Sequence, residues 1–196
     1  MYRFGCFTNQ QVNTVFSGFD RNNLTRWVKK RWLIRLRKGL YTFPEYKQKT
    51  GYIYYFANKI YSPSYISLHT ALGFYGLIPE AVLDMTSITS LKTATFENEF
   101  GNFVYKSVKE DLFFGYDLKK SSENIEIKLA KPEKAILDLL YLYPFYNNEK
   151  EIKELRFDEY FLNNEFDLKL LKEYSARFKN KALDKRTRKF IKAYDL

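Results

Sequence analysis

The chain has 196 residues, is 45% hydrophobic and carries a formal net charge of +10. This composition supports a packed core, and no apolar run reaches the 18 residues that a membrane-spanning helix needs. The polar run TNQQ begins at Thr8, soon after Arg3 and Gly5. Because a signal peptide needs an apolar stretch there, we expect a cytoplasmic protein without membrane contact. The single cysteine, Cys6, excludes an internal disulfide and a cysteine-rich zinc site.

Charge divides the chain into three zones. Residues 1–50 hold eleven Lys and Arg against two acids, a net charge of +9, whereas residues 51–171 hold −5 and residues 172–196 hold +6. Such a concentrated positive charge is typical of a nucleic-acid-binding surface. The alternative is a solvated basic surface on an ordinary domain, because Lys and Arg are common on surfaces. The concentration of +9 in the first quarter of the chain favours nucleic acid.

A first helix is predicted after Thr8. Thr8 and Gln11 form a T-x-x-Q capping box, and the helix is expected to end near Ser17-Gly18. Its inner face is expected to consist of three apolar residues, Val12, Val15 and Phe16.

A basic second helix is predicted after the turn at Gly18-Phe19. Asp20 is a good N-cap, because its carboxylate can accept from the free backbone N–H groups of the first turn. Leu24 and Val28 are four residues apart and form an apolar stripe beside Trp27. The opposite face holds side chains that can donate to phosphate oxygens or base edges, namely Arg21, Asn22, Thr25, Arg26 and Lys29.

A β-hairpin is predicted directly after this helix. Leu33, Arg35 and Arg37 alternate with Ile34 and Leu36, and this period of two indicates a half-buried strand. Lys38-Gly39 supplies the turn, and Leu40 to Phe43 returns before Pro44 ends the pairing. Three cations are therefore expected to project from the hairpin tip, where they would contact a DNA backbone: Arg35, Arg37 and Lys38.

Two helices followed by a basic hairpin predict a winged helix-turn-helix DNA-binding domain at residues 1–48. Such domains normally have a further helix at the start, and Met1 to Phe7 is too short for it. Either the domain is trimmed, or packing against the rest of the protein replaces that helix. The polar segment from Tyr46 to Thr50 marks the boundary to a second domain at residues 51–196.

The second domain is predicted to begin with two helices. One spans Gly51–Tyr61, although its composition leaves a strand possible, and Ser62-Pro63-Ser64 ends it. Ser67 caps the other, which stops at Gly76. Strands are then expected at residues 85–91, 93–100, 102–108, 111–116 and 125–129, with a hairpin turn at Gly101-Asn102 between the second and third.

The rest of the chain is predicted to be helical. Pro132 begins a helix at its N1 position, and KAILDLLYLY is apolar nearly all round, so this helix must be buried. Asp138 within it needs a partner, since an unpaired buried carboxylate is costly. The fold class is therefore α+β: a winged helix-turn-helix, then a mixed α/β domain with a small antiparallel or mixed sheet and C-terminal helices. These last helices are expected at residues 150–157, 167–178 and 182–194.

Two groups of residues are candidates for an active site. His69 is the only histidine, and a structural role is favoured because no nucleophile motif lies beside it. Asp111 or Asp117 could supply a first carboxylate. Glu126 and Lys128 would follow it as an E-x-K motif on a strand, as in metal-dependent nucleases. The two carboxylates would hold Mg²⁺, and the lysine would assist the attacking water. Any exposed strand gives the same triplet, so we expect no catalytic, cofactor-binding or metal-binding residue.

Three segments together resemble the AbiEi family of type IV toxin–antitoxin antitoxins. They are RNNLTRWVKKRWLIRLRKGLYTFP, ANKIYSPSYISLHTALGFYGLIPE and KLAKPEKAILDLLYL, and the resemblance covers nearly the whole chain. Its specific parts are SPSYIS…AL…YGLIPE and A-x-PEKA-x-LDL.

The resemblance implies a bacterial antitoxin whose N-terminal winged helix-turn-helix binds double-stranded DNA at inverted repeats of its own promoter and represses the operon. The C-terminal domain would counteract an AbiEii-type nucleotidyltransferase toxin, with no stable complex assumed. A winged-helix regulator without antitoxin activity and a metal-dependent nuclease are the alternatives. The DNA-contact role falls by position to Arg21, Asn22, Thr25, Arg26, Lys29, Arg35, Arg37 and Lys38.

Overall fold

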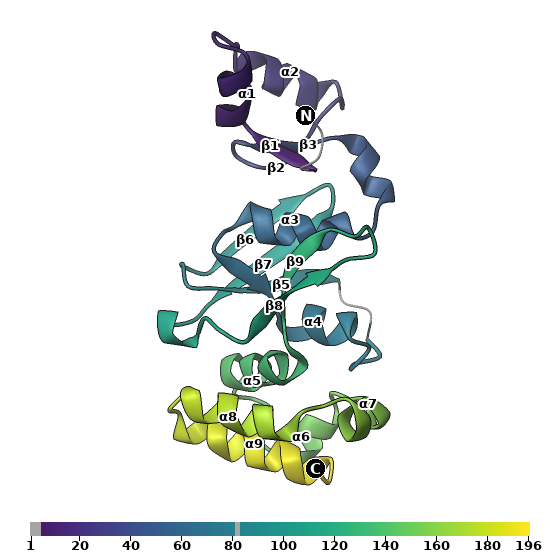
Figure 1. Ribbon diagram of the computed structural model, residues 1–196, viewed down its shortest axis with the longest axis vertical. Coiled ribbons are helices and arrows are strands. Elements are labelled where there is room, and N and C mark those ends of the chain that lie inside the picture. The colour runs from purple at the N-terminus through teal and green to yellow at the C-terminus, as the bar shows by residue number, and fades with distance from the viewer. Residues whose placement is uncertain (1–4, 81–82) are drawn as a thin grey trace.

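The computed structural model describes residues 5–80 and 83–196, and the predicted α+β fold class is confirmed. Figure 1 shows an elongated molecule with the N-terminal elements at one end, a large sheet in the middle and the C-terminal helices at the other end. We call residues 5–48 the N-terminal part and residues 51–196 the C-terminal part.

The N-terminal part has the helix-turn-helix and hairpin arrangement predicted. Its three strands form an antiparallel sheet in the order β1-β3-β2, and β1 was not predicted because three residues give no periodicity. Residues 1–4, which belong to the segment predicted to be too short for a first helix, lie outside the described residues. The elements are β1 (Cys6–Thr8), α1 (Asn9–Val15), α2 (Asn22–Lys29), β2 (Ile34–Arg37) and β3 (Leu40–Thr42).

The capping box of α1 is confirmed, but its predicted inner face is wrong. The Thr8 hydroxyl accepts from the Gln11 backbone N–H, and Gln11 Oε1 accepts from the Thr8 backbone N–H at 2.7 Å. No residue of α1 is buried, and the side chains of Val15 and Phe16 are 50% and 59% exposed. Within the described residues, no element covers the apolar edge of this helix, so its amphipathic pattern lacks the expected partner.

The C-terminal part is built on a six-stranded mixed sheet in the order β6-β7-β5-β4-β9-β8. β5 pairs with β7 and β4 with β9 in parallel, and the other neighbours are antiparallel. A 3₁₀ turn, η1 (Pro44–Gln48), leads from the N-terminal part into α3 (Tyr52–Ile60), so the helix expected there is confirmed. The other elements up to the end of the sheet are β4 (Ser64–Ile66), α4 (Leu68–Phe74), β5 (Asp84–Thr89), β6 (Ala94–Asn98), β7 (Gly101–Ser107), η2 (Glu110–Leu112), β8 (Tyr116–Lys120) and β9 (Glu126–Ala130).

Three details of this sheet differ from the sequence-based predictions. β4 lies in its centre, although Ser62-Pro63-Ser64 was interpreted as a break and no strand was predicted there, because three residues buried on both faces show no alternation. The β6–β7 turn lies at Glu99-Phe100, since Gly101 already pairs with Asn98. The strand predicted at residues 111–116 is wrong, because η2 occupies its start and β8 begins only at Tyr116.

The C-terminal helices form a layer under the sheet. Figure 1 shows α3 between the N-terminal part and the sheet, and α5 between the sheet and the last helices. This position explains why every residue from 133 to 140 is buried, as the apolar pattern predicted. One expected helix, at residues 150–157, ends early, and a short helix that was not predicted follows it. No helix among the described residues is long and apolar enough to cross a bilayer. The elements are α5 (Pro132–Leu142), α6 (Glu149–Lys153), α7 (Glu159–Asn164), α8 (Leu168–Arg177) and α9 (Lys181–Ala193).

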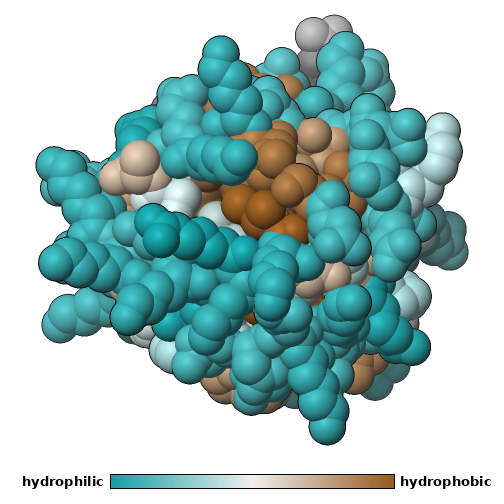
Figure 2. Space-filling view, turned by 90° about the horizontal axis from the view of Figure 1, so that it is seen from below, coloured by the Kyte–Doolittle hydropathy of each residue, from teal (hydrophilic) through white to brown (hydrophobic). Residues whose placement is uncertain are grey.

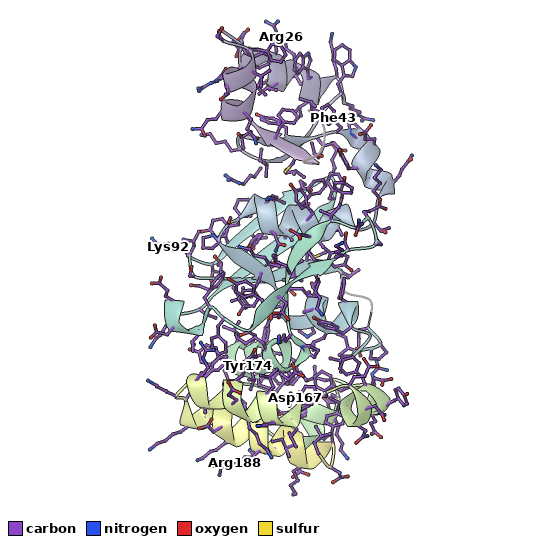
Figure 3. All side chains as sticks on the ribbon, viewed as in Figure 1. Arg26, Phe43, Lys92, Asp167, Tyr174 and Arg188 are labelled. Atoms are coloured by element: carbon purple, nitrogen blue, oxygen red, sulfur yellow. The ribbon has the colours of Figure 1, made fainter. Side chains whose placement is uncertain are left out.

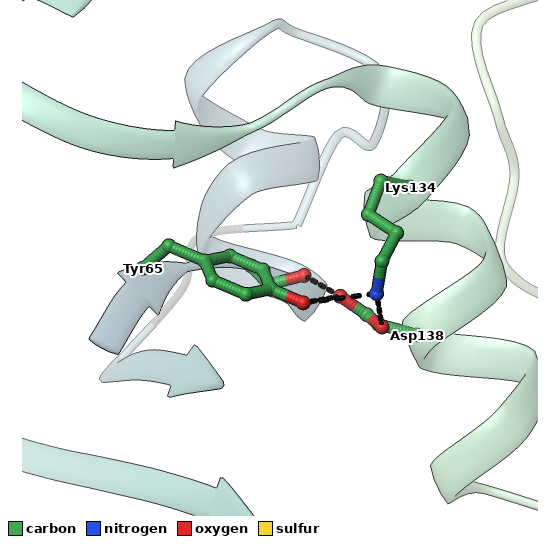
Figure 4. Close-up of polar contacts among 4 residues, drawn as sticks. Tyr65, Lys134 and Asp138 are labelled. Carbon is green, nitrogen blue, oxygen red and sulfur yellow. Dashed lines mark hydrogen bonds and ion pairs between the residues drawn. The ribbon is translucent and has the colours of Figure 1, made fainter. Parts of the chain in front are cut away.

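Asp138 has the partner that its burial requires. Figure 4 shows its carboxylate against the ammonium group of Lys134, one helical turn earlier on α5, and both side chains are 0% exposed. Tyr65 donates to Asp138 Oδ2 at 3.0 Å and accepts from Lys134 Nζ at 2.9 Å. Ser67 donates to the same carboxylate oxygen at 2.8 Å, so its side chain does not cap α4 as predicted, although Ser67 is the N-cap residue.

From this buried network we predict how two substitutions change the free energy of unfolding. Lys134→Met and Asp138→Asn should each lower the free energy of unfolding by about 3–5 kcal/mol, because each leaves the other charge buried without its counter-ion. The double variant should lose less than the sum of the two losses, as a double-mutant cycle from denaturant titrations measures.

The exposed pair Lys192 and Glu149, whose charged atoms are 2.6 Å apart, provides the control. Its double-mutant cycle, with Lys192→Met and Glu149→Gln, should show no measurable coupling, because solvent screens the pair. Additive losses at Lys134 and Asp138 would contradict the account of the buried network.

Candidate nucleic-acid interface

The basic helix α2 lies at the outer end of the molecule (Figure 1). Asp20 Oδ1 accepts from the backbone N–H of Asn22 at 2.9 Å, so the carboxylate satisfies a free donor of the first turn as predicted, but the N-cap residue is Arg21 and not Asp20. Leu24 is 1% exposed and packs in a small core with Leu33 and Tyr41. This core fixes which face of α2 points to solvent.

The opposite face of α2 carries the predicted donors. Arg26 points away from the ribbon at the outer end of the molecule (Figure 3). Among the described residues, no acid lies within ion-pair distance of any cation on this helix. Their positive charges therefore remain available to a polyanion. The exposed donors are Arg21, Asn22, Thr25, Arg26 and Lys29.

Three exposed residues that follow this helix were not among the predicted site residues. Lys30 and Arg31 continue the basic surface, and Arg31 takes a φ of 59° where the chain leaves the helix. Trp32 is 59% exposed, and Lys30 Nζ lies 4.7 Å from its ring centroid. A Trp directly after three cations was the available signal, but the sequence alone could not show that it is exposed.

The hairpin of β2 and β3 forms the wing. Ile34 and Leu36 are buried and alternate with exposed Arg35 and Arg37, as the period of two predicted. Gly39 in the turn has a φ of 81°, a conformation that favours glycine. Lys38 beside it is exposed.

The wing also contacts the C-terminal part. Asn98 on β6 donates from Nδ2 to the backbone oxygen of Leu36 at 3.0 Å. A shallow groove of about 730 Å³ runs between the two, with Arg35, Arg37 and Lys38 on one wall and Glu97 and Glu99 on the other. These acids reduce the positive potential at the wing. We therefore expect α2 to contribute more to the binding of a polyanion than the wing does.

The structure separates the residues of the possible nuclease site. Asp117 pairs with Leu129 across β8 and β9, whereas Glu126 and Lys128 pair with Lys120 and Leu118. Because paired residues share a face and neighbours alternate, Asp117 lies on the opposite face of the sheet from Glu126 and Lys128. Its carboxylate instead lies 3.6 Å from the ammonium group of Lys131.

The remaining candidates form no alternative centre. Asp111 lies on η2 and not on a strand. Within the described ranges, no group of three or more His, Cys, Asp and Glu side chains is placed to hold a metal ion. His69 is partly buried, burial lowers its pKa, and its ring meets that of Tyr143 with centroids 5.9 Å apart. It has the surroundings of a neutral structural histidine.

Comparison with known proteins agrees with the resemblance found in the sequence. Residues 3–44 match the sequence model of a family described as transcriptional regulator, AbiEi antitoxin. The matched segment includes β1 to β3 with α1 and α2, and it contains all eight predicted DNA-contact residues. No curated protein matches the chain. The resemblance to AbiEi antitoxins is thereby confirmed for the N-terminal part.

The wing yields a prediction about the salt dependence of DNA binding. In a plot of log K against log salt, the slope should become shallower by about 0.9 for each phosphate contact that Arg35→Ala, Arg37→Ala and Lys38→Ala remove. Fluorescence anisotropy with a labelled duplex measures this slope.

The matched control is the triple variant Lys181→Ala, Lys185→Ala and Arg188→Ala, which removes three exposed cations from α9 at the opposite end of the molecule. It should leave the slope unchanged. A wing variant with the wild-type slope would show that the wing makes no phosphate contact.

Proposed function

We propose that this chain is a DNA-binding antitoxin of a type IV toxin–antitoxin, or abortive infection, system. It represses its own operon and counteracts a nucleotidyltransferase toxin without a stable complex. One observation carries the proposal: the exposed basic face of α2 lies, with the basic wing, inside the segment that matches AbiEi antitoxin regulators. The predicted site residues keep the DNA-contact role in this proposal.

The geometry of α2 suits the major groove of DNA. A helix fits that groove, and side chains such as Arg26 and Asn22 can form two hydrogen bonds with one base edge. Arg35, Arg37 and Lys38 on the wing would contact phosphates, which sets orientation without reading sequence. The net charge of +9 in residues 1–50 attracts the polyanion and speeds association.

The basic C-terminal segment does not extend this surface. Its exposed cations lie on α8 and α9, at the end of the molecule opposite to α2 (Figure 1). Figure 2 views that end and shows a largely hydrophilic surface around a small hydrophobic patch. DNA bound along α2 is therefore out of reach of α9 in the same molecule.

The division of labour between residues 1–48 and 51–196 is part of the proposal. DNA binding is assigned to the first and toxin neutralisation to the second. The two parts share packing, because the Tyr46 ring lies 4.3 Å from that of Tyr52 and also contacts Phe56. Leu36 and Leu40 belong to the same core. The two activities are therefore best separated by surface substitutions in the full chain.

The full chain with Arg21→Ala and Arg26→Ala should bind its own promoter roughly 10- to 100-fold more weakly. It should no longer repress a promoter reporter but should still rescue cells from the cognate nucleotidyltransferase. The thermal melt should stay unchanged, because both side chains are exposed and unpaired with acids. Reporter activity and toxin rescue are measured in one strain.

Lys181→Ala with Lys185→Ala is the control, because it removes two exposed cations from α9, and it should keep both activities. Normal repression by the α2 variant would refute the role of the basic face. If the wild-type chain represses but does not rescue cells from the toxin, it is a winged-helix regulator without antitoxin activity.

A further inference from the structure

The N-terminal part has an open apolar groove beside α1. The groove has a volume of about 640 Å³ and lies between α1, α2 and the small sheet. Trp32 and Phe16 at its edge are each 59% exposed, and Val15 is 50% exposed. The small core of this part has three buried residues, and the partly buried Phe7, Phe19 and Trp27 that pack against it also line the groove. The walls include Phe7, Val12, Phe16, Trp27, Trp32 and Phe43.

The α1 side of the groove is without charge, whereas Lys30 Nζ lies 4.7 Å from the ring centroid of Trp32 at another part of the edge. The sequence from Gly5 to Phe19 contains no Asp, Glu, Lys or Arg, although residues 1–50 carry +9. Its exposed polar residues include Gln10, Gln11 and Thr14. Amide and hydroxyl groups both donate and accept hydrogen bonds, so such a rim is complementary to a copy of itself. Two copies can approach through this face with less repulsion than their cationic faces would cause.

We propose that this face binds the same face of a second copy of the chain. The apolar edge of α1 in each copy packs into the groove of the other, so one surface supplies both the projection and the groove. This reciprocity defines a two-fold symmetric interface. Val12, Val15 and Phe16 have the i, i+3, i+4 spacing of a helix that anchors in a groove.

The size of the patch limits the strength of this association. The exposed apolar area of Val15, Phe16 and Trp32 is on the order of 300 Å². A stable interface buries about 800 Å² on each partner. The free protein should therefore dimerise weakly, and two copies on one DNA should associate because their effective concentration is high. This last step rests on the proposed DNA binding, whereas the dimer itself does not.

Sedimentation equilibrium combined with tryptophan emission tests the proposal without DNA. Both tryptophans of the chain, Trp27 and Trp32, line the groove, so their emission reports on its occupancy. The mass should rise from monomer toward dimer as the protein concentration approaches about 1 mM. The emission should move to shorter wavelengths over the same concentration range.

Salt distinguishes this association from DNA binding. Raising the salt concentration should strengthen the dimer, because it screens the repulsion between two cationic N-terminal parts. The same change weakens binding to DNA. Failure of one proposal is therefore distinguishable from failure of the other.

Two matched variants locate the interface. Phe16→Ser should abolish the mass increase and the emission shift while the thermal melt stays unchanged, since Phe16 is already 59% exposed. Phe145→Ser should retain both, because Phe145 has the same exposure but lies between α5 and α6. A protein that stays monomeric at about 1 mM, or a mass increase without an emission shift, would overturn the proposal. Equal losses of the mass increase and of the emission shift in the two variants would also overturn it.

Discussion

The fold depends on one buried ion pair, between Lys134 and Asp138 on α5, because that helix has no solvent-facing side. α5 lies between the sheet and the last helices (Figure 1), so a charge within it must be neutralised inside the protein. Tyr65 and Ser67 complete the hydrogen bonding of the carboxylate from β4 and the start of α4. The Lys134 ammonium group also lies 4.9 Å from the ring centroid of Phe178, which directly follows α8. One network therefore joins the sheet, α4, α5 and the C-terminal layer.

Two segments singled out in the sequence, SPSYIS and A-x-PEKA-x-LDL, meet in this network. SPSYIS contributes Tyr65 and Ser67, and A-x-PEKA-x-LDL contributes Lys134 and Asp138. All four side chains are buried, so these residues hold the fold together. The sheet and α3 together hold the N-terminal part, since Asn98 on β6 binds the wing at Leu36 and Tyr46 packs on Tyr52 of α3. The basic helix α2 is thereby held at the outer end of the molecule.

The sequence predicted what local patterns encode. The capping box of Thr8 and Gln11, the alternation in the wing and the proline that begins α5 all have local causes, and the structure confirms each of them. β4 was missed because a short strand buried on both faces has no period. The exposure of Phe16, the acids opposite the wing and the position of Asp117 depend on contacts between segments far apart in the chain. No periodicity reports such contacts.

We propose that the exposed basic face of α2 reads a DNA sequence. It is tested most directly by comparing the affinity of the full chain for duplex DNA from its own promoter with that for a scrambled duplex of equal length and composition. At physiological salt we expect the full chain to bind the promoter duplex at least roughly 1,000-fold more tightly than the scrambled duplex. Equal affinity for the two duplexes would contradict it, because charge alone would then explain the binding.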